Sequence, residues 1–300
     1  MTITLHPRGP FSLTAAATFV EDFPGTQAER APQALRYAWA VDGDWRTVQA
    51  TLRQDDQAVY AELVGRPAAP LARGAARDLE QMLCLDVDGS GFIALGEHDR
   101  VVGTLQRRFP GLRPVLFYTP YEAAAWTIIS QRIRMTQAAT VKARLANELG
   151  EHGAFPAPAR LAQLTAPQRG LTARKVAQLR TLAVAAHDGA LTRQRLRAMS
   201  YQDGLEHLQQ LSGIGPFSAE LILIRGAGYP DALPDHDTRL DEAIRRAYDA
   251  TGNAAIRSIT ESWRPYRAWV ALLLRAWREA ETGEIAHGRR RSTHLKPLDA

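Results

Sequence analysis

The strongest constraint on the fold is a glycine-marked turn in the second half of the chain, the segment Leu211–Gly215 with the sequence Leu-Ser-Gly-Ile-Gly. An apolar stretch that begins at Pro216 and runs to Gly226 follows it and is long enough for a helix. Glycine permits a tight turn and leaves backbone N–H groups uncovered, and proline favours the first turn of a helix. The pattern predicts two helices joined by a tight turn, with bare N–H groups suited to a phosphate at the start of the second helix.

A carboxylate follows this turn at a defined distance. Asp237 comes 22 positions after Gly215, and the apolar positions Leu240 and Ile244 predict a further helix directly behind it. A carboxylate there can stabilise positive charge that develops on a nearby substrate, or it can act only as the N-cap of that helix. Asp235 precedes the same helix and is the alternative candidate for either role.

The turn and the aspartate together resemble the helix-hairpin-helix DNA glycosylases, which carry a Gly/Pro-rich loop and an aspartate. From about Pro110 to Trp277 the order of segments is similar to that of the bacterial 3-methyladenine-DNA glycosylase II family. Besides the turn, the likeness rests on the segments Phe109–Arg113, Tyr121–Gln131, Leu171–Val176 and Trp263–Trp269.

The expected fold class is α+β. Alternation over residues 11–14, 35–38, 45–48 and 58–64, with an Asp-Gly-Asp turn at 42–44, predicts a small antiparallel sheet, and residues 71–83 predict a covering helix. From Tyr121 onward the pattern is helical, with Pro/Gly loops between helices. We therefore expect an N-terminal antiparallel α/β domain over residues 1–110 and an all-α helix-hairpin-helix core over 111–283. A basic, mobile tail over 284–300 completes the predicted chain.

Basic charge is concentrated in the second part of the chain. Residues 1–120 contain 12 Lys and Arg against 14 Asp and Glu, whereas residues 121–300 contain 25 against 18. A net charge of +7 in the part that holds the turn suits a polyanion such as double-stranded DNA.

Several classes of protein are excluded by composition. The single cysteine, Cys84, permits neither an intramolecular disulfide nor a cysteine-ligated iron–sulfur cluster, and the eight histidines form no cluster at metal-ligand spacing. No apolar run reaches the length of a membrane span, and no secretory signal begins the chain. We expect a soluble, cytoplasmic monomer that associates with the nucleoid when it binds DNA and has no membrane partner.

The resemblance implies that Asp237 stabilises an oxocarbenium-like transition state and orients water during cleavage of a glycosidic bond. Phe217 occupies the position at which lyase-competent relatives carry a nucleophilic lysine, so a monofunctional enzyme is expected. In the alkylation enzymes an aromatic residue here faces the base, and Arg275 stands where they have another aromatic residue. Both residues are therefore predicted to line a base pocket. The alternative for Phe217 is a core residue beneath the turn.

The same resemblance predicts the groups that contact DNA. Gln131 and Arg132 would fill or probe the gap left by an extruded nucleotide, or Arg132 would only contact a phosphate. The turn residues Gly213, Ile214 and Gly215, with Ser218, would bind the phosphate backbone. No cofactor is required, but the backbone carbonyls of Gln209, Leu211 and Ile214 would provide a structural Na+ or K+ site.

The function implied is removal of alkylated bases of the 3-methyladenine type from duplex DNA in base-excision repair. Two alternatives stay open at this point: a glycosylase for deaminated or oxidised bases, and a non-catalytic helix-hairpin-helix protein that only binds DNA. Asp237 argues against the second alternative, because a protein that only binds DNA has no need of a carboxylate at this distance.

Overall fold

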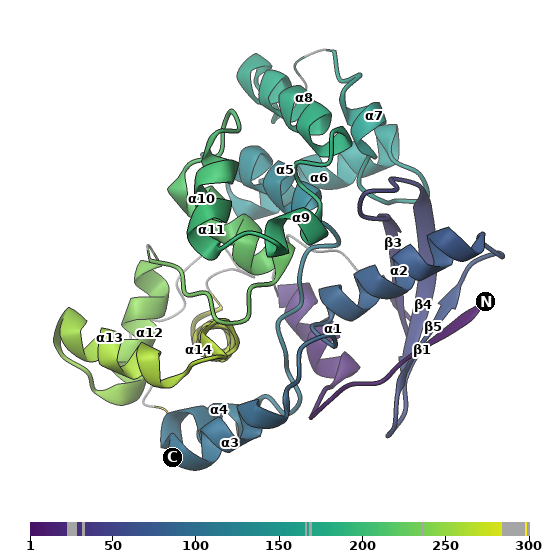
Figure 1. Ribbon diagram of the computed structural model, residues 1–300. Coiled ribbons are helices and arrows are strands. Elements are labelled where there is room, and N and C mark those ends of the chain that lie inside the picture. Colours follow the sequence, from purple (N-terminus) through teal and green to yellow (C-terminus); the bar gives the residue numbers. More distant parts are fainter. Residues whose placement is uncertain are drawn as a thin grey trace.

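The protein combines one antiparallel sheet near its N-terminus with a series of helices (Figure 1). The computed structural model describes residues 1–22, 29–31, 34–165, 167, 170–235, 237–283 and 298. The strands are β1 (Thr2–Leu5), β2 (Glu29–Ala31), β3 (Ala34–Ala40), β4 (Thr47–Gln54) and β5 (Val59–Leu63). They pair in the order β1-β5-β4-β3-β2, and every pairing is antiparallel.

Alternating burial explains the central strands. Along β4 every second residue from Val48 to Leu52 is buried. The same alternation runs along β5 from Val59 to Leu63, so one face of the sheet is covered. The helix α2 (Ala69–Met82) packs on this region, where its Asp78 accepts the Trp39 Nε1–H at 3.0 Å. The predicted strands near 35 and 58, the turn at 42–44 and the covering helix are confirmed, whereas the strand predicted over 45–48 begins only at Thr47 and continues to Gln54.

The predicted strand over residues 11–14 is wrong. Helix α1 (Leu13–Asp22) begins there: the Ser12 hydroxyl accepts the Ala15 N–H at 3.1 Å, and the Gln54 side chain accepts the Leu13 N–H at 2.6 Å. A helix cap and a contact with β4 outweigh an alternation that is only four residues long. The edge strand β1 has no counterpart in the sequence prediction.

Helices make up the chain beyond the sheet and α2. They are α3 (Ser90–His98), α4 (Arg100–Arg108), α5 (Pro120–Ser130), α6 (Met135–Leu149), α7 (Pro158–Leu161), α8 (Ala173–His187), α9 (Arg193–Arg197), α10 (Tyr201–Gln209), α11 (Pro216–Leu221), the π-helical segment η1 (Ile222–Ala227), α12 (Thr238–Tyr248), α13 (Gly252–Ser262) and α14 (Arg267–Thr282). The coarse α+β fold class is confirmed: a sheet at the N-terminus is followed by helices.

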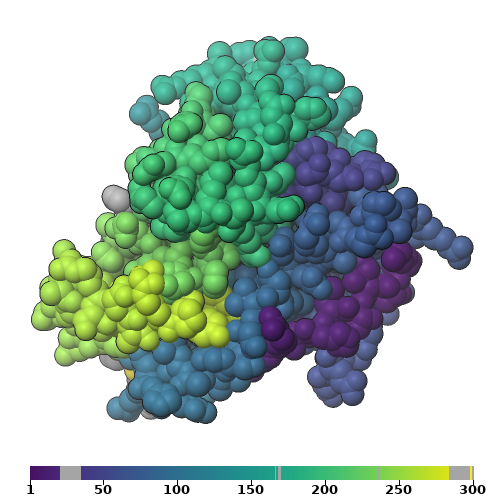
Figure 2. All heavy atoms as spheres, in the orientation of Figure 1, coloured from purple at the N-terminus to yellow at the C-terminus, as the bar shows by residue number. Residues whose placement is uncertain are grey.

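The buried side chains form two clusters. One, which we call the first core, joins residues 5–118 to the C-terminal helices α12 to α14, and the other, the second core, is formed by residues 117–227. Figure 2 shows the same arrangement at the surface, where the C-terminal helices lie beside N-terminal elements. The boundary at residue 110 stays a proposal, and the hydrophobic contacts do not divide the chain there. The tail 284–300 lies outside the described residues, apart from Leu298.

None of the helices in the described ranges is both long and apolar enough to cross a bilayer.

Candidate active site

The glycine-marked turn joins α10 to α11 as the sequence predicts. Gly213 has a φ of +91°, in the left-handed region, while Ile214 is 5% exposed and anchors the turn in the second core. The Ile214 N–H donates to the Leu211 carbonyl at 3.0 Å and closes the turn. Gly215 is exposed, with extended backbone, directly before Pro216. The turn therefore presents its backbone on the surface at the start of α11.

The first turn of α11 provides N–H groups that have no acceptor within the helix. Ala219 donates to the Gly215 carbonyl at 2.9 Å, so the N–H groups of Phe217 and Ser218 are the ones left at the helix start. The Ser218 side chain is only 9% exposed. A phosphate contact at Ser218 would therefore use the backbone N–H and not the hydroxyl.

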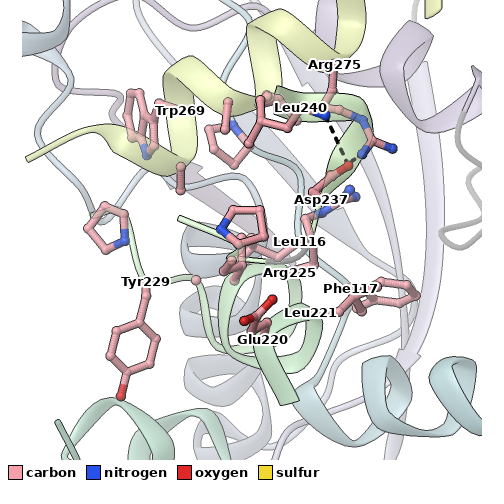
Figure 3. A pocket seen from close by; sticks show the side chains of 18 of the residues that line it. Leu116, Phe117, Glu220, Leu221, Arg225, Tyr229, Asp237, Leu240, Trp269 and Arg275 are labelled. Atoms are coloured by element: carbon pink, nitrogen blue, oxygen red, sulfur yellow. Dashed lines mark hydrogen bonds and ion pairs between the residues drawn. The ribbon is translucent and has the colours of Figure 1, made fainter. Parts of the chain in front are cut away.

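Asp237 lies at the start of α12 and is the N-cap of this helix, which is the alternative role predicted for it. Its Oδ1 accepts the N–H groups of Arg239 and Leu240, each at 3.1 Å, so the carboxylate caps the helix. Its Oδ2 forms an ion pair with Arg275, and both side chains line a cavity of about 300 Å³ (Figure 3). Asp235 is exposed and does not line this cavity. The N-cap thus occupies one carboxylate oxygen, and the other is paired with Arg275 at the wall of the cavity.

The cavity lies between the two cores and is mainly apolar. Its walls come from α5, α11, η1 and α14 and from the segments before α5 and α12, and they include Trp126, Leu116, Phe117, Leu221 and Trp269. Its volume is at the lower end of the range for small-molecule pockets. An aromatic and aliphatic wall with a few charged groups suits a planar heterocycle.

Phe217 stands on the rim of this cavity. Its side chain is 57% exposed, so the core-residue alternative is wrong. The ring is held at the first turn of α11, beside the uncovered N–H groups. A base that entered the cavity would pass this ring, which offers a face for stacking.

Arg275 also lines the cavity, where it forms an ion pair with Asp237, and its role in a base pocket stays a prediction. The side chains of Arg275 and Asp237 are 24% and 17% exposed. The pair lies 38 residues apart in sequence and is made by α14 meeting the start of α12. The Arg275 guanidinium thus offsets the charge of the Asp237 carboxylate, the catalytic candidate of the sequence analysis.

Three charged residues of the cavity, Arg225, Glu220 and Arg239, were not among the predicted site residues. Arg225 of η1 lies near the rings of Phe19 and Phe117, at 5.2 and 6.0 Å, and donates to the Val115 carbonyl at 2.9 Å. Burial, and secondarily the charge of Arg275, lowers the pKa of Arg225 to about 10. Glu220 is 4% exposed and lies on the same wall (Figure 3). Only Glu220 had a signal in the sequence, because it comes three residues after Phe217 and so shares its helix face.

Gln131 and Arg132 lie at the end of α5, outside the cavity. The Gln131 side chain donates to the Gly213 carbonyl at 2.8 Å, which brings the segment after α5 against the turn. Arg132 is exposed and has a φ of +57°. This backbone conformation is uncommon for residues other than glycine and asparagine. The structure therefore groups Gln131, Arg132 and the turn on one surface.

The carbonyls of Gln209, Leu211 and Ile214 belong to the turn, and a monovalent cation there stays a prediction. The Leu211 oxygen accepts the Ile214 N–H and keeps a second lone pair. Among the described residues, no group of three or more His, Cys, Asp or Glu side chains is placed to hold a metal ion.

The chain is similar in sequence to known DNA repair proteins. It is 26% identical over 196 residues to a DNA-3-methyladenine glycosylase of Bacillus subtilis, a match that covers 62% of this chain and 65% of the relative. It is 30% identical over 188 residues to DNA-3-methyladenine glycosylase 2 of Escherichia coli, covering 59% of this chain and 63% of the relative. The aligned part thus spans less than two thirds of the length of these curated relatives. No family model matches the chain.

The fold is found in a solved structure over nearly the whole chain. The 3-methyladenine DNA-glycosylase of Archaeoglobus fulgidus superposes with a TM-score of 0.73 at 19% identity, and the match covers 92% of this chain and 98% of that one. At 19% identity this superposition shows the fold alone. The similarity in sequence rests on the matches to the Bacillus subtilis and Escherichia coli proteins. The chain is a relative of the DNA-3-methyladenine glycosylases and has the fold of their superfamily, the helix-hairpin-helix DNA glycosylases.

Proposed function

We propose that this protein is a monofunctional DNA glycosylase that hydrolyses the N-glycosidic bond of alkylated bases, of the 3-methyladenine type, in duplex DNA during base-excision repair. The observation that carries the proposal is the Asp237 carboxylate, held by two N–H groups at the wall of an apolar cavity. The names of the sequence relatives agree with this activity.

DNA binding would begin at the turn between α10 and α11. The N–H groups of Phe217 and Ser218 are suited to a phosphate, and Gln131 and Arg132 lie on the same surface. Bases inside a duplex cannot reach a side chain in a cavity, so the damaged nucleotide must rotate out of the stack. The extruded base would pass Phe217 and enter between the apolar walls.

Asp237 would then act on the sugar. As the glycosidic bond breaks, positive charge develops on the sugar ring, and a fixed carboxylate stabilises it. The same oxygen accepts a hydrogen bond from the attacking water. Oδ1 is occupied by the cap of α12, so Oδ2 is the atom available for this work, and Arg275 must share it or move aside.

Water is the proposed nucleophile because no described lysine lies in the cavity. Lys142 is buried in an ion pair with Glu122 at 2.5 Å, Lys175 is bound to backbone carbonyls, and Lys296 lies outside the described residues. Phe217 cannot form a Schiff base. The reaction as proposed needs neither metal nor cofactor, and the protein would act as a cytoplasmic monomer, associated with the nucleoid when bound to DNA.

A second candidate activity is release of neutral damaged bases, such as deaminated or oxidised ones. The charges of the cavity favour it, because three guanidinium groups (Arg225, Arg239 and Arg275) outnumber two carboxylates (Glu220 and Asp237) and oppose a positively charged purine. A preference for neutral over cationic bases would identify this activity.

The test is release of free base from methylated duplex DNA, followed by chromatography of the soluble bases. We expect release of 3-methyladenine that chelator does not slow, and an abasic strand that remains intact until it is heated in alkali. Binding without release would establish the non-catalytic alternative, and a covalent protein–DNA adduct trapped by borohydride would contradict the monofunctional reaction.

A further inference from the structure

The short segment between α5 and α6, residues 131–134, contains an unfavourable backbone conformation at Arg132, which contacts from outside the segment must stabilise. Arg132 has a φ of +57°, which costs on the order of 1 kcal/mol for a residue with a Cβ atom. Its side chain is exposed, and the neighbouring Ile133 N–H donates to the Ser130 carbonyl only at 3.4 Å. The segment itself therefore provides little to fix this conformation.

Lys175 of α8 supplies the missing support. Its ammonium group donates to the Ile129 carbonyl at 2.7 Å and to the Gln131 carbonyl at 2.8 Å, at the end of α5 where helix carbonyls lack partners. The side chain is 9% exposed. Burial lowers the pKa of the Lys175 ammonium, and no opposing carboxylate contributes to that pKa. The cation is thus buried to bind backbone carbonyls.

The same helix also contacts the turn before α11. Gln178, one helical turn beyond Lys175, lies against Gly213, where an added Cβ would come within 2.7 Å of the Gln178 amide nitrogen. Gln131 closes the link from the other side through its hydrogen bond to the Gly213 carbonyl. Gln131, Lys175 and Gln178 line a cleft of about 480 Å³ between residues 131–133, residues 170–172 and α8. Helix α8 therefore connects the end of α5 to the turn.

A direct phosphate contact is the competing role for a lysine in this position. Two of the three N–H donors of Lys175 are already used by carbonyls, and little of the side chain reaches the surface. Its neighbour Arg174 is exposed on the same helix and is the better placed of the two for such a contact.

We propose that Lys175 is a positioning residue, which holds the segment 131–134 in register with the turn so that Arg132 and the turn act on DNA as one rigid unit. This inference rests on the proposed DNA-binding function and adds to it a residue that need touch neither DNA nor base. Without this support, Arg132 would still be present, but it would lose its fixed position relative to the phosphate contacts.

The test measures insertion into DNA separately from base release. The probe is a duplex with 2-aminopurine beside a tetrahydrofuran abasic-site analogue, and its fluorescence rises when the 2-aminopurine is unstacked. We expect Lys175→Met to lower the unstacking equilibrium about tenfold, while affinity for intact duplex and its salt dependence stay unchanged. Lys175→Arg should restore most of the signal. Arg180→Met, which removes an exposed charge of α8 outside this cleft, is the matched control and should leave unstacking unchanged.

A second variant keeps the test valid if Lys175→Met folds poorly. Gln131→Leu breaks the same link from α5, and its effect should not add to that of Lys175→Met. A Lys175→Met protein that unstacks normally, or whose salt slope alone falls by about one, would overturn the proposal in favour of a phosphate contact or no role. Wild-type protein that binds without unstacking would also overturn it. Unstacking without base release would instead contradict the proposed enzymatic function alone.

Discussion

Asp237 has two functions that a single substitution can separate. Asparagine is as good an N-cap as aspartate, so Asp237→Asn keeps an acceptor for the Arg239 and Leu240 N–H groups but removes the negative charge. We expect base release to fall at least about 100-fold, with DNA affinity nearly unchanged and thermal stability lowered only by the loss of the ion pair with Arg275. Single-turnover release and a melting curve check this expectation.

Asp235→Asn is the matched control for that substitution. Asp235 is exposed and lies outside the cavity, so its loss should leave base release intact. The assignment of Asp237 is wrong if the control abolishes release and Asp237→Asn does not.

Arg275 and Phe217 should set the charge preference of the pocket. Arg275→Met removes a cation from the cavity and frees the Asp237 carboxylate, and Phe217→Trp adds a more electron-rich ring. Each should shift the ratio of 3-methyladenine to hypoxanthine release toward the cationic base, by about fivefold or more. Arg257→Met, which removes an exposed charge on α13, serves as control. Unchanged ratios in both variants would exclude a charge-selective pocket.

At the scale of elements, alanine in place of each glycine of the turn should affect a different property: stability at Gly213 and DNA binding at Gly215. Gly213→Ala meets both a φ of +91° and the Gln178 amide at 2.7 Å, so it should lower the free energy of unfolding by about 1–2 kcal/mol. Gly215→Ala has extended backbone and no atom within 4 Å of the new Cβ. It should keep full stability but weaken DNA binding, since the methyl group would stand over the phosphate site. Urea unfolding and filter binding of both variants test this pair, and equal losses of stability would contradict it.

The elements also show what the sequence could and could not predict. The strands near 35 and 58 follow from alternation because one face of the sheet is buried. The turn before α11 follows from Gly213, whose left-handed backbone suits glycine. The Asp237–Arg275 pair could not be predicted, because it depends on how α14 meets α12. The same holds for Lys175 and Gln131, whose contacts arise only when three helices come together.

At the scale of the whole molecule, a buried polar cluster connects the sheet and α2 to the second core. Arg193 is fully buried and donates to the carbonyls of Gly226, Phe117 and Tyr118 at 2.9 to 3.1 Å. Its backbone N–H donates to Asp42, whose own N–H donates to Asp78 at 2.9 Å. Asp78 also accepts from Trp39.

This cluster makes stability depend on pH. Burial raises the pKa of Asp78 from 3.8 to about 6, and it raises the pKa of Asp42 as well. Between pH 4 and pH 6 the Asp78 carboxyl keeps its proton in the folded protein but has lost it in the unfolded chain. The free energy of unfolding should therefore fall as pH rises from 4 to 6. For Asp78 the fall amounts to about 3 kcal/mol.

Urea unfolding at several pH values tests this expectation. Asp78→Asn should lack the corresponding part of the decline, while the exposed control Asp56→Asn should decline like the wild type. Parallel curves for wild type and Asp78→Asn would show that Asp78 does not titrate in this range.

The division of the buried side chains into two cores has a consequence for synthesis on the ribosome. Among the described residues, the fully buried members of the second core all come from residues 117–227, a continuous stretch that is synthesised before the C-terminal helices. The first core also includes residues 240–277, and α14 packs against α4, so apolar surface on α4 stays open until the last helices are made. The nascent protein would therefore keep the surface of α4 that α14 later covers exposed until the end of translation, and we expect this to be the stage at which a chaperone protects it.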